Sequence, residues 1–199
     1  MIQNRILNSK KMKGVVLIFA FIGVTAIHNV QAQTIRYVQL DGTSDGSSWT
    51  SAAGNIQDMI DASSAGDQIW IASGNYGTHG ITFYMKDGVH LYGGFAGNET
   101  SIDSRAKSDR DGNGKVETWE FTNETILNLN HSIGEVIRLG TLSVEFNIET
   151  QLDGFTVTGG SVGIKSYGKT IINNCIIHDN ANDNTGSETR GVYILVKEQ

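Results

Sequence analysis

The sequence is poor in cysteine and proline, and each shortage narrows the possible folds. The chain of 199 residues has one cysteine, Cys175, and no proline. A single cysteine cannot form an internal disulfide, so a disulfide-stapled scaffold is excluded and stability must come from backbone hydrogen bonds and packing. Without proline, the turns must be made by Gly, Asn, Asp and Ser, and glycine is abundant, with 24 residues.

Basic residues are also scarce, with 15 Lys and Arg against 21 Asp and Glu, a formal net charge of −6. This balance argues against a nucleic-acid partner, because phosphate binding needs a basic stripe and the sequence has none. An acidic excess suits solubility outside the cell and, where carboxylates cluster, the binding of hard cations. The histidines show no pair at metal-ligand spacing, and no constellation of catalytic residues is found.

The one long apolar run lies near the N-terminus, at residues 15–27 (VVLIFAFIGVTAI). It follows a basic, acid-free segment, is too short to span a bilayer comfortably, and precedes Val30-Gln31-Ala32, which fits a signal-peptidase site. We therefore predict a signal peptide at residues 1–32 and a protein that is secreted, to the extracellular medium or the outer cell surface. An uncleaved N-terminal anchor is the alternative. Cleavage would remove four cations (Arg5, Lys10, Lys11 and Lys13) and leave a net charge of −10.

The remaining residues, 33–199, predict one all-β domain. Ile56, Met59 and Ile60 lie at helical spacing before Gly66, which predicts one short amphipathic helix within residues 53–63. The other segments are short strand patterns separated by turn residues. They are QIWIASG, GITFYM, GVHLYGGF, ETILNL, EVIRL, LDGFTVTGG, VGIKSY, TIINNCIIHDN and GVYILV, preceded by IRYVQLDG.

Two of these segments repeat at a spacing of 20 residues. LDGFTV at 152–157 and INNCII at 172–177 each have apolar residues at their first, fourth and sixth positions. A straight strand would turn the fourth side chain to the wrong face, so the chain must bend at Gly154 and Asn174, two residue types that accept a positive φ. A similar offset relates residues 69–71 to 89–91. This periodicity predicts a solenoid of stacked parallel strands.

These segments, together with GGFAGNETSIDSR, resemble the opening coils of exported bacterial right-handed parallel β-helix proteins of the pectin-lyase-like superfamily. The resemblance implies that the short helix caps the N-terminal end of the solenoid. It also implies an interior lined by eight residues: Ile69, Ile71, Val89, Leu91, Phe155, Val157, Cys175 and Ile177. The sequence stops at the start of what should be another coil, so the domain is expected to be incomplete at its C-terminus, as a fragment, or else to be a short solenoid closed by a partner.

A calcium-loop pattern interrupts the strands within an expected insertion at about residues 98–122. An EF-hand loop needs oxygen ligands at positions 1, 3, 5 and 12, a glycine at position 6 and a backbone carbonyl at position 7. The pattern is met in full by Asp109, Asp111, Asn113, Gly114, Lys115 and Glu120, with Glu117 at position 9. The flanking segments lack the two helices of a calcium sensor, which favours a structural Ca²⁺ site. A solvated acidic turn is the alternative.

Two functions fit these observations. The first is an adhesion or glycan-contacting scaffold with a structural calcium loop, whose partner is an extracellular polysaccharide or cell-surface glycan. The second is the N-terminal part of a polysaccharide lyase or glycoside hydrolase whose catalytic coils are absent. For lyase chemistry the candidate bases would be Arg138, Lys165, Lys169 and Arg190, but no aspartate pair is placed near them on a matching strand.

Overall fold

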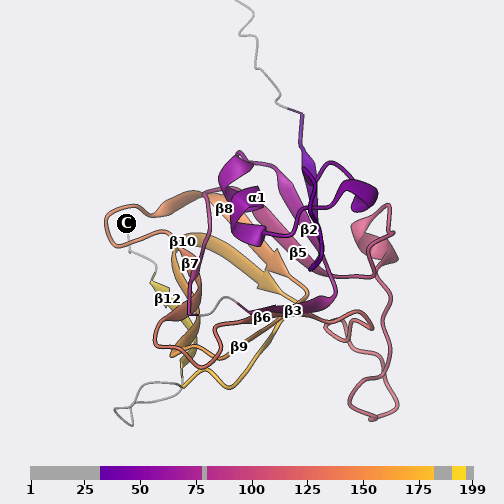
Figure 1. The fold of residues 1–199 in the computed structure, drawn as a ribbon. Coiled ribbons are helices and arrows are strands. Elements are labelled where there is room, and N and C mark those ends of the chain that lie inside the picture. Colours follow the sequence, from indigo (N-terminus) through magenta and orange to yellow (C-terminus); the bar gives the residue numbers. More distant parts are fainter. Residues whose placement is uncertain (1–31, 78–79, 182–189, 196–199) are drawn as a thin grey trace, which may run out of the picture. The chain divides into compact units, whose positions relative to one another are not determined.

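The computed structural model describes residues 32–77, 80–181 and 190–195, the last range by its backbone alone. Except for Ala32, the predicted signal peptide lies outside the described residues. The described residues form a predominantly β structure, and their strand ladders are all parallel (Figure 1).

The elements follow one another as short strands with few helical turns. The helical elements are η1 (Trp49–Ser51), α1 (Ile56–Ala62) and η2 (Ile102–Ser104). The first strands are β1 (Ile35–Val38), β2 (Gln68–Ala72), β3 (Gly74–Gly77), β4 (Phe83–Tyr84), β5 (His90–Phe95) and β6 (Thr125–Asn128). The later strands are β7 (Glu135–Leu139), β8 (Phe146–Asp153), β9 (Phe155–Thr158), β10 (Val162–Asn173), β11 (Ile176–Ile177) and β12 (Arg190–Leu195).

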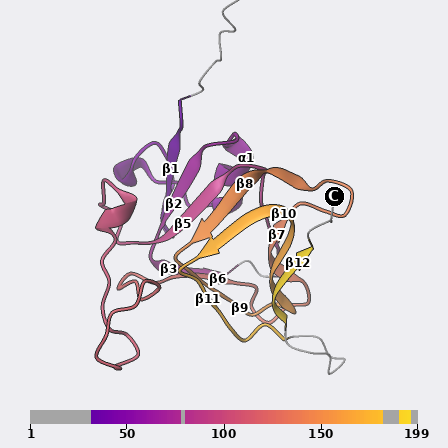
Figure 2. The ribbon, with the colours of Figure 1, turned by 180° about the vertical axis from the view of Figure 1, so that it is seen from behind.

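The strands form three ladders that the chain visits repeatedly in the same order. The first ladder runs β1-β2-β5-β8-β10, the second β3-β6-β9-β11, and the third β4-β7-β10-β12. The long strand β10 pairs with β7 and β12 through its first half and with β8 through its second half, so it joins the first and third ladders into one sheet. Figure 2 shows β1, β2, β5, β8 and β10 side by side.

The register of the first ladder aligns apolar side chains into a buried row. Ile69 pairs with Leu91, Leu91 with Leu152, and Leu152 with Ile172. The predicted alignment of residues 152–157 with 172–177 is confirmed, whereas that of residues 69–71 with 89–91 is wrong by two residues. Successive side chains of a strand point to opposite faces, so a shift of two keeps the same side chains inside and the pattern cannot distinguish the registers.

Most of the residues predicted to face inward do so. Ile69, Ile71, Val89, Leu91, Phe155 and Val157 are buried in one cluster, while Cys175 and Ile177 pack against it and stay half-buried. Cys175 precedes β11 and Ile177 lies within it, and β11 has a neighbour on one side only among the described strands. Two stretches of strand were not predicted: β3, whose sequence GNYG reads as a turn, and residues 146–151 of β8.

The two predicted bends have the expected backbone. Gly154 has φ 83° and Asn174 has φ 49°, and each stands between a strand of the first ladder and the next element of the second. A side chain at position 154 would also have little room. An added Cβ would lie 2.9 Å from Gly93 O and 2.8 Å from Arg105 Nη1. Glycine is therefore required here both by conformation and by packing.

The predicted helix is α1, and Asn55 caps its N-terminus. The Asn55 side chain accepts hydrogen bonds from the backbone N–H groups of Gln57 and Asp58. Ile56 and Ile60 are buried in the core cluster. On the outer side, Gln57 Oε1 accepts from Tyr84 N at 2.9 Å and Gln57 Nε2 donates to Tyr84 O at 3.0 Å, so one side chain occupies both backbone positions of the edge strand β4.

Candidate metal centre

The acidic pattern lies in the long loop that joins β5 to β6. The loop narrows to a neck where Lys107 and Phe121 form an antiparallel bridge. Backbone hydrogen bonds on either side of it, from Ser108 N to Glu120 O (3.1 Å) and from Thr122 N to Ala106 O (2.9 Å), hold the two arms together. These contacts join the two ends of residues 109–120, so this segment forms a closed turn.

Asp109 organises the first half of this turn. Its Oδ1 accepts from the backbone N–H groups of Gly112 (2.7 Å) and Asn113 (3.1 Å), and its Oδ2 from that of Gly114 (2.8 Å). Gly112 and Gly114 have φ 75° and 84°, a conformation that glycine adopts without strain. The sequence DGNG thus folds the backbone around the Asp109 carboxylate.

Glu120 reaches back across the turn and is buried. Its Oε1 accepts from the N–H groups of Arg110 (2.8 Å) and Asp111 (3.2 Å), and its Oε2 from that of Glu117 (2.9 Å). These backbone hydrogen bonds, the one from Glu117 above all, lower the pKa of Glu120 from its usual 4.5 to about 2. Glu120 is therefore a fixed anion inside the turn.

Three carboxylates converge at this point. Asp109, Asp111 and Glu120 each offer an oxygen, and these oxygens lie within 4.8 Å of one another. Asp109 and Asp111 are exposed, while Glu120 closes the inner side. The three form the one such group of His, Cys, Asp or Glu residues found among the described side chains, and they could hold a metal ion.

Glu117 supplies a further test of whether a cation fits. Its Oε1 accepts from Asn113 Nδ2 at 3.2 Å, but its Oε2 is buried without a hydrogen-bond donor. The neighbouring Glu120 carboxylate raises the pKa of Glu117. A buried acceptor without a donor, beside a second carboxylate, is destabilising until a proton or a cation satisfies it. The donor set is all oxygen, which suits hard divalent cations.

The other two predicted ligands lie in the same turn. Asn113 Oδ1 accepts from Lys115 N at 2.9 Å, and Asn113 Nδ2 donates to Asp111 Oδ2 at 3.0 Å. Lys115 is exposed, as a residue needed only for its carbonyl can be. All six predicted ligand residues are thus brought into one turn.

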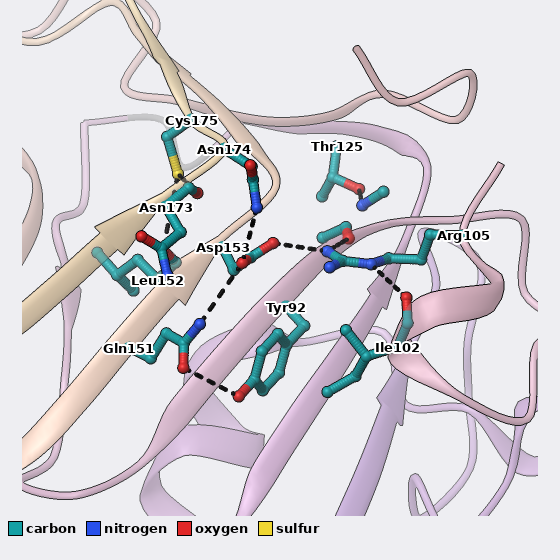
Figure 3. Close-up of polar contacts among 12 residues, drawn as sticks. Tyr92, Ile102, Arg105, Thr125, Gln151, Leu152, Asp153, Asn173, Asn174 and Cys175 are labelled. Atoms are coloured by element: carbon teal, nitrogen blue, oxygen red, sulfur yellow. Dashed lines mark hydrogen bonds and ion pairs between the residues drawn. The ribbon is translucent and has the colours of Figure 1, made fainter. Parts of the chain in front are cut away.

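A second set of contacts, shown in Figure 3, fastens the loop to the first ladder. Arg105 follows η2 and donates through Nη1 to Gly93 O (2.8 Å) and Asp153 Oδ1 (2.9 Å). Asp153 Oδ2 also accepts from Asn174 Nδ2 at 3.0 Å. The Arg105 and Asp153 side chains are 7% exposed, and the guanidinium carbon lies 4.4 Å from the centre of the Phe121 ring. This buried ion pair links the loop to β8.

Arg110 links the turn to the second ladder. Its Nη2 lies 2.8 Å from Glu124 Oε2, and Glu124 Oε1 accepts from the Thr156 hydroxyl at 2.6 Å. Arg110 lies between Asp109 and Asp111 in the sequence. Its backbone N–H donates to Glu120 inside the turn, while its side chain points out of the turn to Glu124. The turn is thereby held against β6 and β9.

The loop also covers an aromatic group on the outer face of the first ladder. Trp70, Tyr92 and Phe95 are buried there, with Trp49 and Ile102 packed against them. The Trp70 and Phe95 rings stack at 4.8 Å. Trp70 also contacts the Tyr37 ring of β1, so this face of the ladder is covered by aromatic side chains rather than exposed to solvent.

The remaining polar candidates have local roles. His90 Nδ1 accepts from Gln151 N at 3.2 Å, and burial lowers the pKa of His90. His178 Nδ1 lies 2.8 Å from Asp179 Oδ2 at an exposed position. Asn180 is buried, and its Nδ2 donates to Val157 O at 2.9 Å, so this asparagine satisfies a backbone carbonyl.

Sequence reasoning missed both anchors of the loop, Arg105 with Asp153 and Arg110 with Glu124. The residues of these pairs are 48 and 14 positions apart in the sequence, and no periodicity relates either arginine to its acidic partner. Within the described ranges, no helix is long and apolar enough to cross a membrane. Comparisons of the chain with protein-family models, with curated proteins and with solved structures find no match.

Proposed function

We propose that this protein is an exported right-handed parallel β-helix module with a structural calcium loop, and that it serves as an adhesion or glycan-contacting scaffold. The observation that carries the proposal is the cluster of Asp109, Asp111 and Glu120, held in a turn that is fastened to two strand ladders. A cation bound there would stabilise the module rather than move it.

The order of the strands supports the β-helix. The chain passes through the three ladders in the sequence β2, β3, β4, then β5, β6, β7, then β8, β9, β10. Crossover connections between parallel strands are right-handed in nearly all proteins, because right-twisted strands return to the sheet in that sense. Each circuit buries its apolar row only against the next one, as in other solenoids.

Calcium is favoured over other cations by the ligands. Ca²⁺ takes six to eight oxygens in flexible arrangements, and carboxylates together with an amide and a backbone carbonyl meet that need. The buried, donor-free Oε2 of Glu117 is an additional oxygen at the same turn. Extracellular calcium modules have dissociation constants of about 10⁻⁴ to 10⁻³ M, and an exposed turn of this kind belongs in that range.

A row of side chains on the third ladder supports the contact with glycans. Tyr84 pairs in register with Arg138, and Arg138 with Lys165, so the three lie side by side on neighbouring strands. Glu135 contacts both cations, with Oε1 2.9 Å from Lys165 Nζ and Oε2 3.9 Å from Arg138 Nη1. Tyr84 is 53% exposed. An exposed ring beside two cations that share one carboxylate suits a sugar bearing an acidic group.

Calorimetric titration of the chain from Gln33 onward with Ca²⁺ tests the proposal. We expect about one site, a higher melting temperature at millimolar Ca²⁺, and loss of both effects in Asp111→Asn. Asp103→Asn is the matched control, because Asp103 is an exposed acid of the same loop outside the cluster. A folded chain that gives no heat at millimolar Ca²⁺ would contradict the calcium loop.

The glycan contact is tested separately by retention on immobilised polygalacturonate and on neutral dextran. We expect retention on the acidic polymer, reduced by Lys165→Gln and Arg138→Gln but unchanged by Lys115→Gln, which removes an exposed cation elsewhere. Equal retention of all three variants would contradict a role for the third ladder.

A further inference from the structure

The turn contains a chemical arrangement that the cation site does not explain. Asn113–Gly114 is the single Asn–Gly pair in the sequence. Both residues are exposed, and an added Cβ at Gly114 would have no atom within 4 Å. The backbone nitrogen that follows Asn113 is therefore free of steric hindrance, in contrast to asparagines followed by larger residues, such as Asn98 and Asn147.

The hydrogen bonds around this pair match the needs of an attack on the Asn113 side-chain amide. Gly114 N–H, the group that would attack, donates to Asp109 Oδ2 at 2.8 Å. Asn113 Oδ1, where negative charge would develop, accepts from Lys115 N–H at 2.9 Å. The Asp109 carboxylate can act as the general base that takes the proton of the attacking nitrogen, and the Lys115 N–H can stabilise the developing oxyanion. Both effects accelerate such a reaction. The short link between the groups supplies proximity.

We propose that Asn113 is a site of deamidation assisted by the folded turn. The Gly114 nitrogen forms a bond with Asn113 Cγ while its proton passes to Asp109. The Cγ–Nδ2 bond then breaks, and Nδ2 takes up that proton and leaves as ammonia, which gives a succinimide. Water opens the succinimide at either of its two carbonyls and leaves an aspartate or an isoaspartate at position 113. One water is consumed and one ammonia released, and no other reactant is needed.

The modification would change the turn. Asn113 Nδ2 donates to Asp111 Oδ2 at 3.0 Å and to Glu117 Oε1 at 3.2 Å. Deamidation replaces this donor with a carboxylate, so two hydrogen bonds become two contacts between like charges. An aspartate adds a further oxygen anion for a cation, whereas an isoaspartate lengthens the backbone within the turn. The fraction of molecules deamidated at position 113 would therefore increase with time after synthesis.

The test is the rate of deamidation at Asn113, measured by peptide mass spectrometry during incubation in water enriched in heavy oxygen. The full chain from Gln33 onward is incubated with a chelator at mildly alkaline pH, folded and in concentrated urea, so the result does not depend on calcium binding. Asn98 and Asn147 in the same digests are internal references. We expect folded Asn113 to react about tenfold faster or more than the same residue in urea, given the usual size of base assistance.

Two variants separate the base from general effects of charge. Asp109→Asn removes the acceptor of the Gly114 proton and should slow the reaction about tenfold or more. Asp103→Asn removes the same charge from the same loop at an exposed position outside the turn, and should change the rate less than about threefold. Folded Asn113 reacting no faster than unfolded Asn113, or both variants reacting equally slowly, would overturn the proposal.

Discussion

Arg105 Nη1 lies 2.9 Å from Asp153 Oδ1, and both side chains are almost fully removed from solvent. Arg105 belongs to the loop after β5, and Asp153 is the last residue of β8. Asp153 pairs in register with Asn173 and with Tyr92, so the ion pair is placed over three neighbouring strands of the first ladder. The loop is therefore anchored on the strand scaffold through a buried charge pair.

Breaking this pair should be costly. Asp153→Asn leaves the Arg105 guanidinium buried without its counter-charge, and removal of one partner of a buried pair costs about 3–5 kcal/mol. Urea unfolding measures the difference. Glu135→Gln is the control, because it weakens the more exposed pair with Lys165 and should cost less than about 1 kcal/mol. Equal destabilisation by the two substitutions would contradict the anchoring role.

Alanine should be tolerated differently at two glycines with similar backbone. Gly66 has φ 92° and open space around an added Cβ, so Gly66→Ala should cost only the left-handed strain of about 1–2 kcal/mol. Gly154→Ala carries the same strain and also brings its Cβ to 2.9 Å from Gly93 O, so it should cost clearly more. Thermal unfolding of both variants tests this, and similar melting temperatures would show that the bend can relax.

The Cys175 thiol should react slowly in the folded protein. Burial raises its pKa from 9.0 to about 11, so little thiolate is present near neutral pH. Labelling with iodoacetamide should therefore be much slower in the native chain than in urea. Equal rates would mean that the thiol leaves its place beside Leu152 and Asn173.

Calcium binding should release protons at acidic pH. The pKa of Glu117 is raised above 4.5 in the cation-free turn, whereas Glu120, with a pKa of about 2, stays ionised above 4.5. A cation must displace any proton on Glu117, so affinity should rise as the pH increases from 4.5 through the raised pKa of Glu117, then level off. Glu120 itself adds stability that is present above pH 4.5 and is lost as the pH falls toward 2.

Titrations in two buffers with different heats of ionisation count the protons released. Glu117→Gln is the matched variant, because it keeps the shape of the side chain without the titrating group. It should remove the pH dependence of affinity over this window. A wild-type affinity that stays constant from pH 4.5 upward would show that Glu117 does not face the cation.

The sequence predicted what depends on neighbouring residues. The short helix α1, the bends at Gly154 and Asn174, and the gathering of Asp109, Asp111 and Glu120 in one turn all follow from local residue chemistry. The register of β2 against β5 did not follow, because a shift of two keeps the same side chains inside. The contacts of Arg105 and Arg110 did not follow either, because they depend on where a long loop lies on the finished strands.

Gln57 bears on how copies of this protein behave at high concentration. Its amide occupies the backbone N–H and C=O of Tyr84, at the edge of β4 where another strand would otherwise add. An open strand edge is the usual template for polymerisation between molecules. A single side chain thus blocks the addition of a strand at this edge, and Gln57→Ala would expose the edge to polymerisation while leaving the core untouched.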